Sequence, residues 1–364
     1  MNAAEQSVAA KRLAAEHGFP LSGIALVAED GLSPGSDAYA KWLGAGHHGP
    51  LDYMHYTREK RVNLRARFEW ARSVLAVAAF YDAEERGTPG IDLEPHVARY
   101  ARGRDYHRVF AKRLKLLEEA LRNAGVCSRT WHYTDTGPLL ERAWAEAAGL
   151  GWVGKNACLI HPRLGSFMLL AEIVMDSTPA PDKPEPFHCG TCTRCLDACP
   201  THAFTAPGVL DARKCLVTWN IEEQGRTPPE YWEKQGAWAA GCDICQTVCP
   251  FNAPSRVASP DLELAQKLPW QEMSLADAIT LTPDRFDQAF TASALRRTTL
   301  KGLRLGAITA AGNVKSQTCV AALRECLRDP DEDIRVRAQW ALEQFGTTRP
   351  CPSGTAPGSS SSTS

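Results

Sequence analysis

The chain has 364 residues, of which 44% are hydrophobic and 23% are charged, and its formal net charge is −1. This length favours two or three domains, and this composition excludes a disordered protein. The near-zero charge gives no whole-molecule argument for nucleic acid binding, although it leaves room for a local basic patch. The sequence has no run of 18 apolar residues and no apolar segment typical of a signal peptide near Met1. We therefore expect no membrane span and a cytoplasmic location.

Residues 1–180 are predicted to form an α/β domain. Short apolar runs rich in β-branched residues predict strands at 23–30, 73–81, 128–135, 157–162 and 166–175. Helical patterns lie between them at 3–17, near 97–124 and at 138–149. Gly125 and Gly149 stand where the second and third helices should end. This alternation indicates a sheet that is covered by helices.

The remaining sequence divides into three further segments. The proline-rich stretch PAPDKPEP at 179–186 predicts a boundary, followed by a cysteine-rich module at 181–258 and a helical domain at 259–346. The phrase DPDEDIRVRAQWAL (329–342) is similar to a HEAT repeat, with Ile334, Val336, Ala338 and Leu342 available for packing. So short a repeat cannot form a free solenoid and is expected to dock on the rest of the chain. The tail 347–364 is rich in Ser, Gly, Pro and Thr and is predicted to be disordered.

The cysteine-rich module carries the most specific signal. The stretch HCGTCTRCLDACP (188–200) has the C-x2-C-x2-C-x3-C-P pattern of bacterial ferredoxins, in which the fourth cysteine binds the other cluster. The stretch CDICQTVCP (242–250) offers only three thiolates, and Cys215, in DARKCLVTW, takes the place of the missing eighth. We predict two [4Fe–4S] clusters: cluster 1 on Cys189, Cys192, Cys195 and Cys249, and cluster 2 on Cys199, Cys215, Cys242 and Cys245. Zinc is the alternative, because C-x2-C pairs are common in zinc sites, but the C-x3-C-P spacing favours iron–sulfur.

Longer motifs carry a resemblance to a known family. ARYARGRDYH (98–107), YTDTGPLLER (133–142), GWVGKNACLIHPRLGSFMLLAEI (151–173) and the cysteine motifs resemble the epoxyqueuosine reductases, over most of residues 20–315. The resemblance implies an α+β fold: a nitroreductase-like α/β domain that binds cobalamin, a ferredoxin-like two-cluster module and a HEAT-like C-terminal helical domain. It implies reduction of epoxyqueuosine to queuosine in the anticodon loop of tRNA. The corrinoid motif D-x-H-x-x-G is absent, as expected for base-off cobalamin bound without a histidine ligand.

The same resemblance assigns the proton donor to Asp135, and we expect burial to raise its pKa. The plainer alternative is that Asp135 is a turn or cap residue ahead of Pro138. Cobalamin contacts are implied at Arg61, Thr134, Asp135, Lys155, Asn156, Val217, Cys242 and Asp243. Arg61 could instead be a solvated charge, and Lys155 and Asn156 a polar turn. The stretch VTWNIE after Cys215 departs from the SYLTIE of many relatives, so contacts near Val217 are the least secure.

Two basic stretches suggest how tRNA is held. Residues 293–317 contain five Lys or Arg and no acid, and residues 96–115 contain seven and one acid. Such a run is usually a solvated face, but in a tRNA enzyme it would contact phosphates. The expected tRNA contacts are Gln224, Arg296, Arg297, Lys301 and Arg304. The partners are then tRNA carrying epoxyqueuosine and an electron donor that the sequence does not name, and we expect a monomer.

Two other functions compete with this one. A cobalamin-dependent reductive dehalogenase would share the cofactors, but it is typically exported with a twin-arginine leader, which this N-terminus lacks. A two-cluster electron carrier would need only the cysteine motifs. Corrinoid binding after reconstitution distinguishes the carrier from both enzymes.

Overall fold

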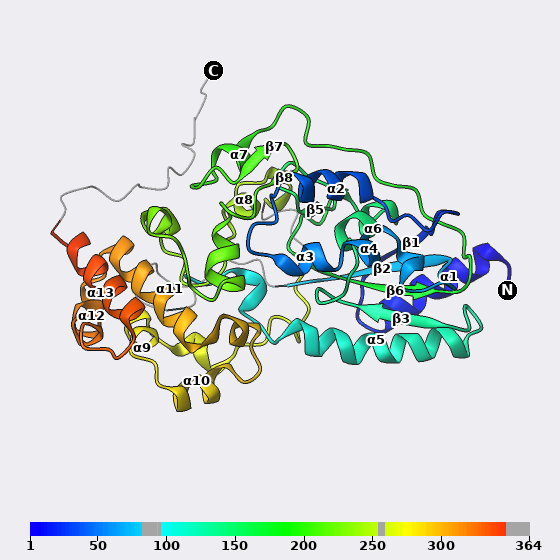
Figure 1. Cartoon of the computed structure of the whole chain (residues 1–364). Coiled ribbons are helices and arrows are strands. Elements are labelled where there is room, and N and C mark those ends of the chain that lie inside the picture. Colours follow the sequence, from blue (N-terminus) through cyan, green and yellow to red (C-terminus); the bar gives the residue numbers. More distant parts are fainter. Residues whose placement is uncertain (82–92, 94–95, 254–258, 347–364) are drawn as a thin grey trace, which may run out of the picture.

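The computed structural model describes residues 1–81, 93, 96–253 and 259–346. The N-terminal sheet and the C-terminal helices lie at opposite ends of the molecule, and the cysteine-rich segment lies between them along one side (Figure 1). The predicted disorder of 347–364 concerns residues outside the described ones.

The N-terminal part is built on a four-stranded antiparallel sheet. Its strand order is β1 (Leu21–Leu26), β2 (Ser73–Phe80), β6 (Met168–Met175) and β3 (Thr130–Tyr133). The helices α1 (Ala3–Glu16) and α5 (Tyr106–Asn123) share a core with one face, and α6 (Glu141–Ala147) packs on the other. Because both faces are covered, every residue of β2 is buried. The predicted sheet with helices on it is therefore confirmed.

Several predicted bounds differ from the observed ones. The helix expected near 97–124 begins only at Tyr106, because Asp105 caps it by accepting the N–H of His107, and 99–101 form a separate 3-10 turn, η3 (Arg99–Ala101). Gly125 and Gly149 do end their helices, with φ of 70° and 78°. The strand expected at 157–162 shrinks to β5 (Leu159–Ile160), which forms a small hairpin with β4 (Trp152–Val153).

Short elements lie between the first two strands of the sheet and within the cysteine-rich segment. Between β1 and β2 lie α2 (Ser36–Gly44), α3 (Asp52–Tyr56), α4 (Arg58–Val62) and the turn η1 (Leu64–Ala66). In the cysteine-rich segment α7 (Arg194–Asp197) contacts α8 (Ile244–Thr247). The inserted residues between Cys215 and Cys242 form a π-helix, η4 (Thr218–Glu222), and two 3-10 turns, η5 (Pro229–Tyr231) and η6 (Glu233–Gln235). The hairpin β7 (Phe204–Ala206) and β8 (Val209–Leu210) and the turn η7 (Pro250–Asn252) complete the segment.

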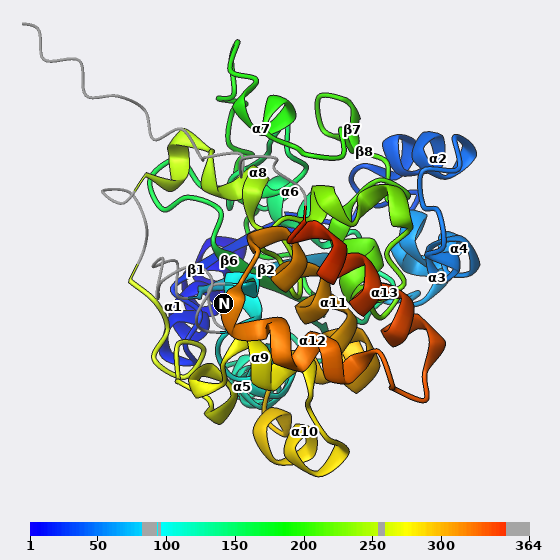
Figure 2. The ribbon, with the colours of Figure 1, turned by 90° about the vertical axis from the view of Figure 1, so that its left-hand side faces the viewer.

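The C-terminal part is helical and docks as expected. Its elements are η8 (Pro269–Glu272), α9 (Leu275–Ile279), α10 (Pro283–Phe290), η9 (Ala294–Thr298), α11 (Thr299–Val314), η10 (Gln317–Cys319), α12 (Val320–Cys326) and α13 (Glu332–Gln344). The C-terminal helices face the viewer in Figure 2. Its core includes residues of η3 and of the insertion, such as Ala101 and Ala239. A Cβ on Gly306 of α11 would lie 1.8 Å from the Ala239 carbonyl oxygen, so only glycine permits this approach.

Helix α13 packs with a face that differs in part from the expected one. Ile334 and Ala338 are buried as predicted, but Val336 is 51% exposed. Arg337 is buried instead, with its guanidinium 4.2 Å from the Trp232 ring centroid and a hydrogen bond of 2.7 Å to Thr309 Oγ1. This buried cation joins the insertion to the helical end.

Candidate active site

The eight thiols predicted as ligands lie in two sets of four. Burial, followed by the neighbouring thiols Cys249, Cys189 and Cys192, raises the pKa of Cys195 to about 11. Burial and the neighbours Cys215 and Cys199 raise the pKa of Cys242, and Cys245 lies against Cys242 and Cys215. This grouping matches the partition predicted from the spacing, while the ligand assignment itself stays a prediction. Among the described residues no three His, Cys, Asp or Glu side chains are placed to hold a single metal ion.

Hydrogen-bond donors point at two of these sulfurs, and such hydrogen bonds help to set the reduction potential of an iron–sulfur cluster. The Trp152 indole donates to Cys189 Sγ at 3.4 Å, and the Ala203 N–H donates to Cys199 Sγ at 3.3 Å. A ninth thiol, Cys158, lies beside Cys245, which the sequence gave no reason to expect because Cys158 stands outside both motifs.

Lys155 and Asn156 lie in the turn between β4 and β5, as the alternative interpretation predicted, but both side chains also form hydrogen bonds to main-chain carbonyls. Lys155 Nζ donates to the carbonyls of Gly190 at 2.7 Å and Cys192 at 2.9 Å. Asn156 is buried and donates to the Cys245 carbonyl at 3.3 Å. The hairpin thus holds one loop from each thiol set, and the predicted cobalamin contacts of both residues remain predictions.

Asp135 lies at the end of β3 in a strained turn, with φ of 57°. Its Oδ2 lies 2.9 Å from His107 Nε2, and His107 Nδ1 lies 2.8 Å from Asp105 Oδ1. A neutral imidazole can donate only once, whereas the protonated ring donates to both carboxylates. Burial alone would lower the pKa of His107, but its two carboxylate partners outweigh burial and raise it.

The expected direction of the Asp135 pKa is wrong for this arrangement. Burial does act to raise the pKa, but the hydrogen bond and charge of His107, followed by Tyr106 and Arg297, outweigh it and lower the pKa. The side chain is also 54% exposed, so burial is weaker than expected. Two glutamates on the sheet side of the site have a raised pKa instead: Glu141, whose pKa burial raises to about 7, and Glu172.

Other polar groups converge on Asp135 from elements far apart in the sequence. Its charge raises the pKa of Tyr53 on α3, Tyr100 on η3, Tyr106 on α5 and Glu222 on η4, in each case after the larger effect of burial. These side chains therefore surround one region, which is not what a simple turn residue would produce. The motifs that carry the family resemblance contain His107, Glu141 and Glu172, but the sequence pointed to no role for these three residues.

The remaining predicted cofactor residues border this region. Arg61 is only 7% exposed and donates to the Leu139 carbonyl at 2.9 Å, so the solvated interpretation is wrong. Thr134 Oγ1 donates to the Leu170 carbonyl at 2.9 Å. Asp243 is buried, and its Oδ2 accepts the Arg99 N–H at 2.8 Å. Val217 lies two residues after Cys215 and packs on the helical core.

The basic stretch at 293–317 is largely neutralised in space, which the sequence count did not predict. Arg296 pairs with Asp287 at 2.8 Å, and Arg304 pairs with Asp329 at 2.6 Å. Lys301 Nζ lies 2.8 Å from an Asp331 carboxylate oxygen and 2.6 Å from one of Asp333.

Two of the expected tRNA residues behave differently. The charge of Arg297 acts on Asp135, His107 and Glu222 and so faces the region described above. Gln224 adopts a φ of 52°, and a Cβ on Gly302 would lie 2.6 Å from its carbonyl oxygen. All five tRNA contacts remain predictions.

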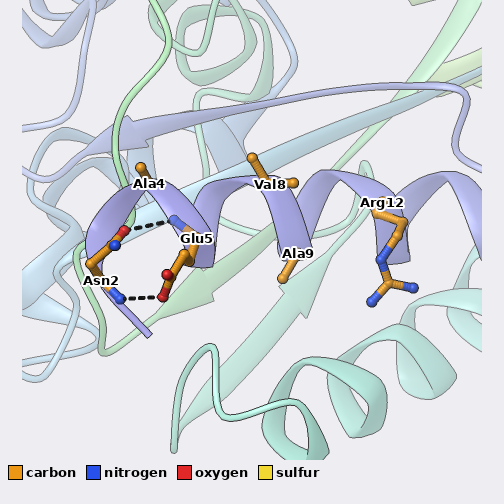
Figure 3. A pocket seen from close by; sticks show the side chains of 6 residues that line it. All are labelled: Asn2, Ala4, Glu5, Val8, Ala9 and Arg12. Atoms are coloured by element: carbon orange, nitrogen blue, oxygen red, sulfur yellow. Dashed lines mark hydrogen bonds between the residues drawn. The ribbon is translucent and has the colours of Figure 1, made fainter.

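Two surface hollows lie away from these residues. One, of about 400 Å³, follows the outer side of α1 and is lined by Asn2, Ala4, Glu5, Val8, Ala9 and Arg12 (Figure 3). The other, of about 470 Å³, is lined by residues that include Gln6 and Arg122. Neither is lined by a predicted site residue. Among the described residues, no helix is long and apolar enough to span a membrane.

Comparison with known proteins identifies three regions. Residues 61–136 match the family "Epoxyqueuosine reductase QueG, DUF1730", residues 188–252 match the "4Fe-4S double cluster binding domain", and residues 289–353 match "HEAT repeats". The double-cluster match spans all eight spaced cysteines and decides against zinc.

Whole-chain relatives agree with these matches. An epoxyqueuosine reductase of Gloeobacter violaceus is 42% identical over 301 residues, covering 81% of this chain and 92% of the relative. One from Xanthomonas campestris is 35% identical over 347 residues, covering 92% and 95%. A crystal structure of epoxyqueuosine reductase with an epoxyqueuosine-modified tRNA-Tyr stem loop is similar, with a TM-score of 0.82 and 29% identity, covering 95% and 92%. The Bacillus subtilis structure, with its catalytic aspartate loop swung out of the active site, has a TM-score of 0.79 and 28% identity, covering 94% and 91%.

Proposed function

Because the chain belongs to the epoxyqueuosine reductase family, we infer that it reduces epoxyqueuosine to queuosine in tRNA. The observation that carries this inference is the convergence of Asp135, His107 and the surrounding tyrosines beside the second thiol set. Loss of the epoxide oxygen as water leaves an alkene, so each turnover needs two electrons and two protons. The chain must therefore supply an electron path and a renewable acid at one place.

The electron path is the double-cluster module. The two thiol sets would hold two [4Fe–4S] clusters, each of which carries one electron at a time. The second thiol set, which would hold cluster 2, is on the side of Asp135. Asp243 follows Cys242, and after burial, Glu222 and Asp135 its charge also raises the pKa of Tyr100. Asp243, beside the second thiol set, and Asp135 therefore both lie near Tyr100.

Cobalamin in the base-off form is the cofactor that the family resemblance implies here, bound by the nitroreductase-like sheet domain. When bound, it supplies a low-valent cobalt centre that passes electrons to the epoxide. Arg61, Thr134, Lys155, Asn156, Val217, Cys242 and Asp243 are the residues expected to hold it. Asn156 and Asp243 lie beside the second thiol set, and their hydrogen bonds to the Cys245 carbonyl and the Arg99 N–H fix the loops that would border the cofactor.

Asp135 is proposed as the proton donor, with His107 as its proton source. In the resting arrangement the proton is held by the imidazolium between Asp105 and Asp135. Transfer along the 2.9 Å contact from His107 Nε2 to Asp135 Oδ2 places it on the exposed carboxyl, which can deliver it to the leaving alkoxide. The pKa of Asp135 is low while His107 carries the proton, which is the state before the proton moves to Asp135.

The Asp135 loop is also proposed to move. The loop of the Bacillus subtilis relative has been captured swung out of its active site. In this chain the positive φ of Asp135 makes the inward conformation costly without contacts that hold it. We infer that the loop closes on substrate and opens for release.

The substrate is tRNA carrying epoxyqueuosine, and a similar enzyme has been crystallised with such a stem loop. Arg297, which faces Asp135, is the strongest candidate for a phosphate contact beside the modified base, and Gln224 is a second candidate. Arg296, Lys301 and Arg304 would have to break their ion pairs with acids to contact phosphate. The enzyme is proposed to be monomeric and cytoplasmic and to take electrons from a separate donor.

The test is turnover by the full chain reconstituted with iron and sulfide. We expect conversion of epoxyqueuosine in tRNA when cobalamin and a chemical reductant are both present, and none when cobalamin is omitted. A protein that contains both clusters but shows neither corrinoid absorbance nor turnover would be an electron carrier. Dehalogenation of bromophenols without tRNA turnover would indicate a reductive dehalogenase.

A further inference from the structure

Glu172 is an acid in the middle of β6 within an apolar layer. It is 0% exposed, and its strand neighbours are Ala76 of β2 and Tyr133 of β3. Among the described residues, neither of its carboxylate oxygens has a hydrogen-bond donor. A carboxylate without donors in such a place is strongly unfavourable, so Glu172 holds a proton. Burial first, and then Glu141, raise its pKa well above the usual value.

The group that faces Glu172 is Glu141, the first residue of α6. Two carboxylates cannot hydrogen-bond to each other, but one proton between them allows Glu172 to donate to Glu141. Around Glu141, burial and then the charge of Asp135 raise its pKa to about 7, while the Asp135 N–H, Arg142 and Arg61 act to lower it. Tyr106 of α5 also faces Glu141.

Glu141 in turn holds the catalytic loop, because its Oε1 accepts the backbone N–H of Asp135. The loop is therefore held at two points, by His107 at the Asp135 side chain and by Glu141 at the main chain. The left-handed backbone of Asp135 is unfavourable for a residue with a side chain, so these two contacts offset the strain.

We propose that Glu141 is a positioning residue whose carboxylate latches the Asp135 loop in the active site, and that the proton held by Glu172 keeps this carboxylate in place. The latch is closed when Glu141 is ionised, because a charged acceptor binds an N–H more strongly than a neutral one. Uptake of a second proton by the pair weakens the latch and lets the loop move out. The proposal rests on the proposed function only for the catalytic role of Asp135.

The first test is Glu141→Ala, with hydrogen exchange of the Asp135 and Thr136 amides as the readout. Loss of a charge-assisted hydrogen bond should speed exchange at Asp135 by about tenfold or more. We expect kcat to fall by a similar factor, while KM for tRNA and the iron content stay the same. Glu146→Ala is the matched control, because Glu146 lies on the same helix and also accepts a main-chain N–H, that of Val153 at 2.7 Å. The control should leave Asp135 exchange unchanged.

The second test is Glu172→Leu, which removes the proton that Glu172 donates to Glu141, with Glu172→Gln as the matched control, because its amide can still donate. Without this donor the ionised form of Glu141 is less stabilised, so Glu141 should ionise at higher pH. The pH at which the Asp135 amide loses protection should therefore move up in Glu172→Leu and stay close to the wild-type value in Glu172→Gln. An unchanged pH in Glu172→Leu would show that Glu172 does not hold the Glu141 carboxylate, even if Glu141→Ala failed to fold. Wild-type exchange in a folded Glu141→Ala would overturn the latch. Failure of the proposed function is separate, since it would appear as an inactive wild type with the exchange results intact.

Discussion

Charged residues are concentrated in two regions, the surroundings of Asp135 and the outer face of the C-terminal helices, which carries Arg296, Lys301 and Arg304. The folded chain arranges these charges differently in the two regions. Around Asp135, groups from α3, α5, η3, η4 and η9 face one another and shift each other's pKa. On the outer face, Arg296, Lys301 and Arg304 are paired with acids of α10 and of the α12–α13 turn and α13. A cluster of like charges in the sequence therefore does not predict the electrostatic potential at the protein surface, because the neutralising charges come from other segments.

The largest effect is expected where the Asp135 region loses its electron supply. Cys215→Ala removes one ligand of the second thiol set, so about four of roughly eight irons per chain should be lost and turnover should cease. The matched control is Cys319→Ala, since Cys319 is buried in the helical core and should change neither iron content nor turnover. Iron analysis and electron paramagnetic resonance measure both. Full iron in Cys215→Ala would place the eighth ligand elsewhere, with Cys158 as the first residue to examine.

The next effect concerns the acid itself. Asp135→Asn keeps the size and turn-forming ability of the side chain but cannot donate a carboxylic proton, so turnover should fall at least about a hundredfold. Clusters and tRNA affinity should be retained. Asp287→Asn, which only frees Arg296 on the outer face, should keep wild-type turnover. Normal activity of Asp135→Asn would return this residue to a turn role.

A smaller effect on tRNA binding should distinguish the cations of the two regions. Arg297→Gln should weaken tRNA binding by about tenfold and reduce the log–log salt slope by about one unit, the value for one lost phosphate contact. Lys301→Gln removes a charge that Asp331 and Asp333 already neutralise, so it should leave the salt slope unchanged. Binding measured across a salt series decides this. The reverse result would mean that tRNA breaks the outer ion pairs and lies across that face.

The smallest effect is a pH dependence of stability from His107. Its pKa is raised in the folded protein, so its stabilising contribution is fully present below the unfolded value of about 6.5 and is lost as pH rises through the raised folded value. We expect His107→Gln to lower the free energy of unfolding by about 1 kcal/mol at pH 5.5 and by less at pH 9. Denaturant unfolding at the two pH values measures the difference. A loss that grows with pH would show that the neutral ring is the stabilising form.

Features set by residues close together in the sequence were predictable, and features set by distant residues were not. The predicted ligand partition rests on the C-x2-C and C-x3-C spacing, because a short loop limits which sulfurs can meet around one cluster. Strands and the helix ends at Gly125 and Gly149 were predictable because they are set by local periodicity and by backbone conformation. The start of α5 was placed too early, although its capping residue, Asp105, is also a local signal.

The sequence by itself determined the family, the two-cluster module and the candidate acid, because long motifs and cysteine spacing are local in the chain. Only the tertiary structure decided the electrostatics of the site. It placed His107 on Asp135 and so lowered a pKa that burial alone would raise. It set Glu141 against Glu172 behind the loop and buried Arg337 on Trp232. Each of these contacts joins residues distant in sequence, and both the cost of burying a charge and the partner that offsets it depend on where the folded chain brings them together.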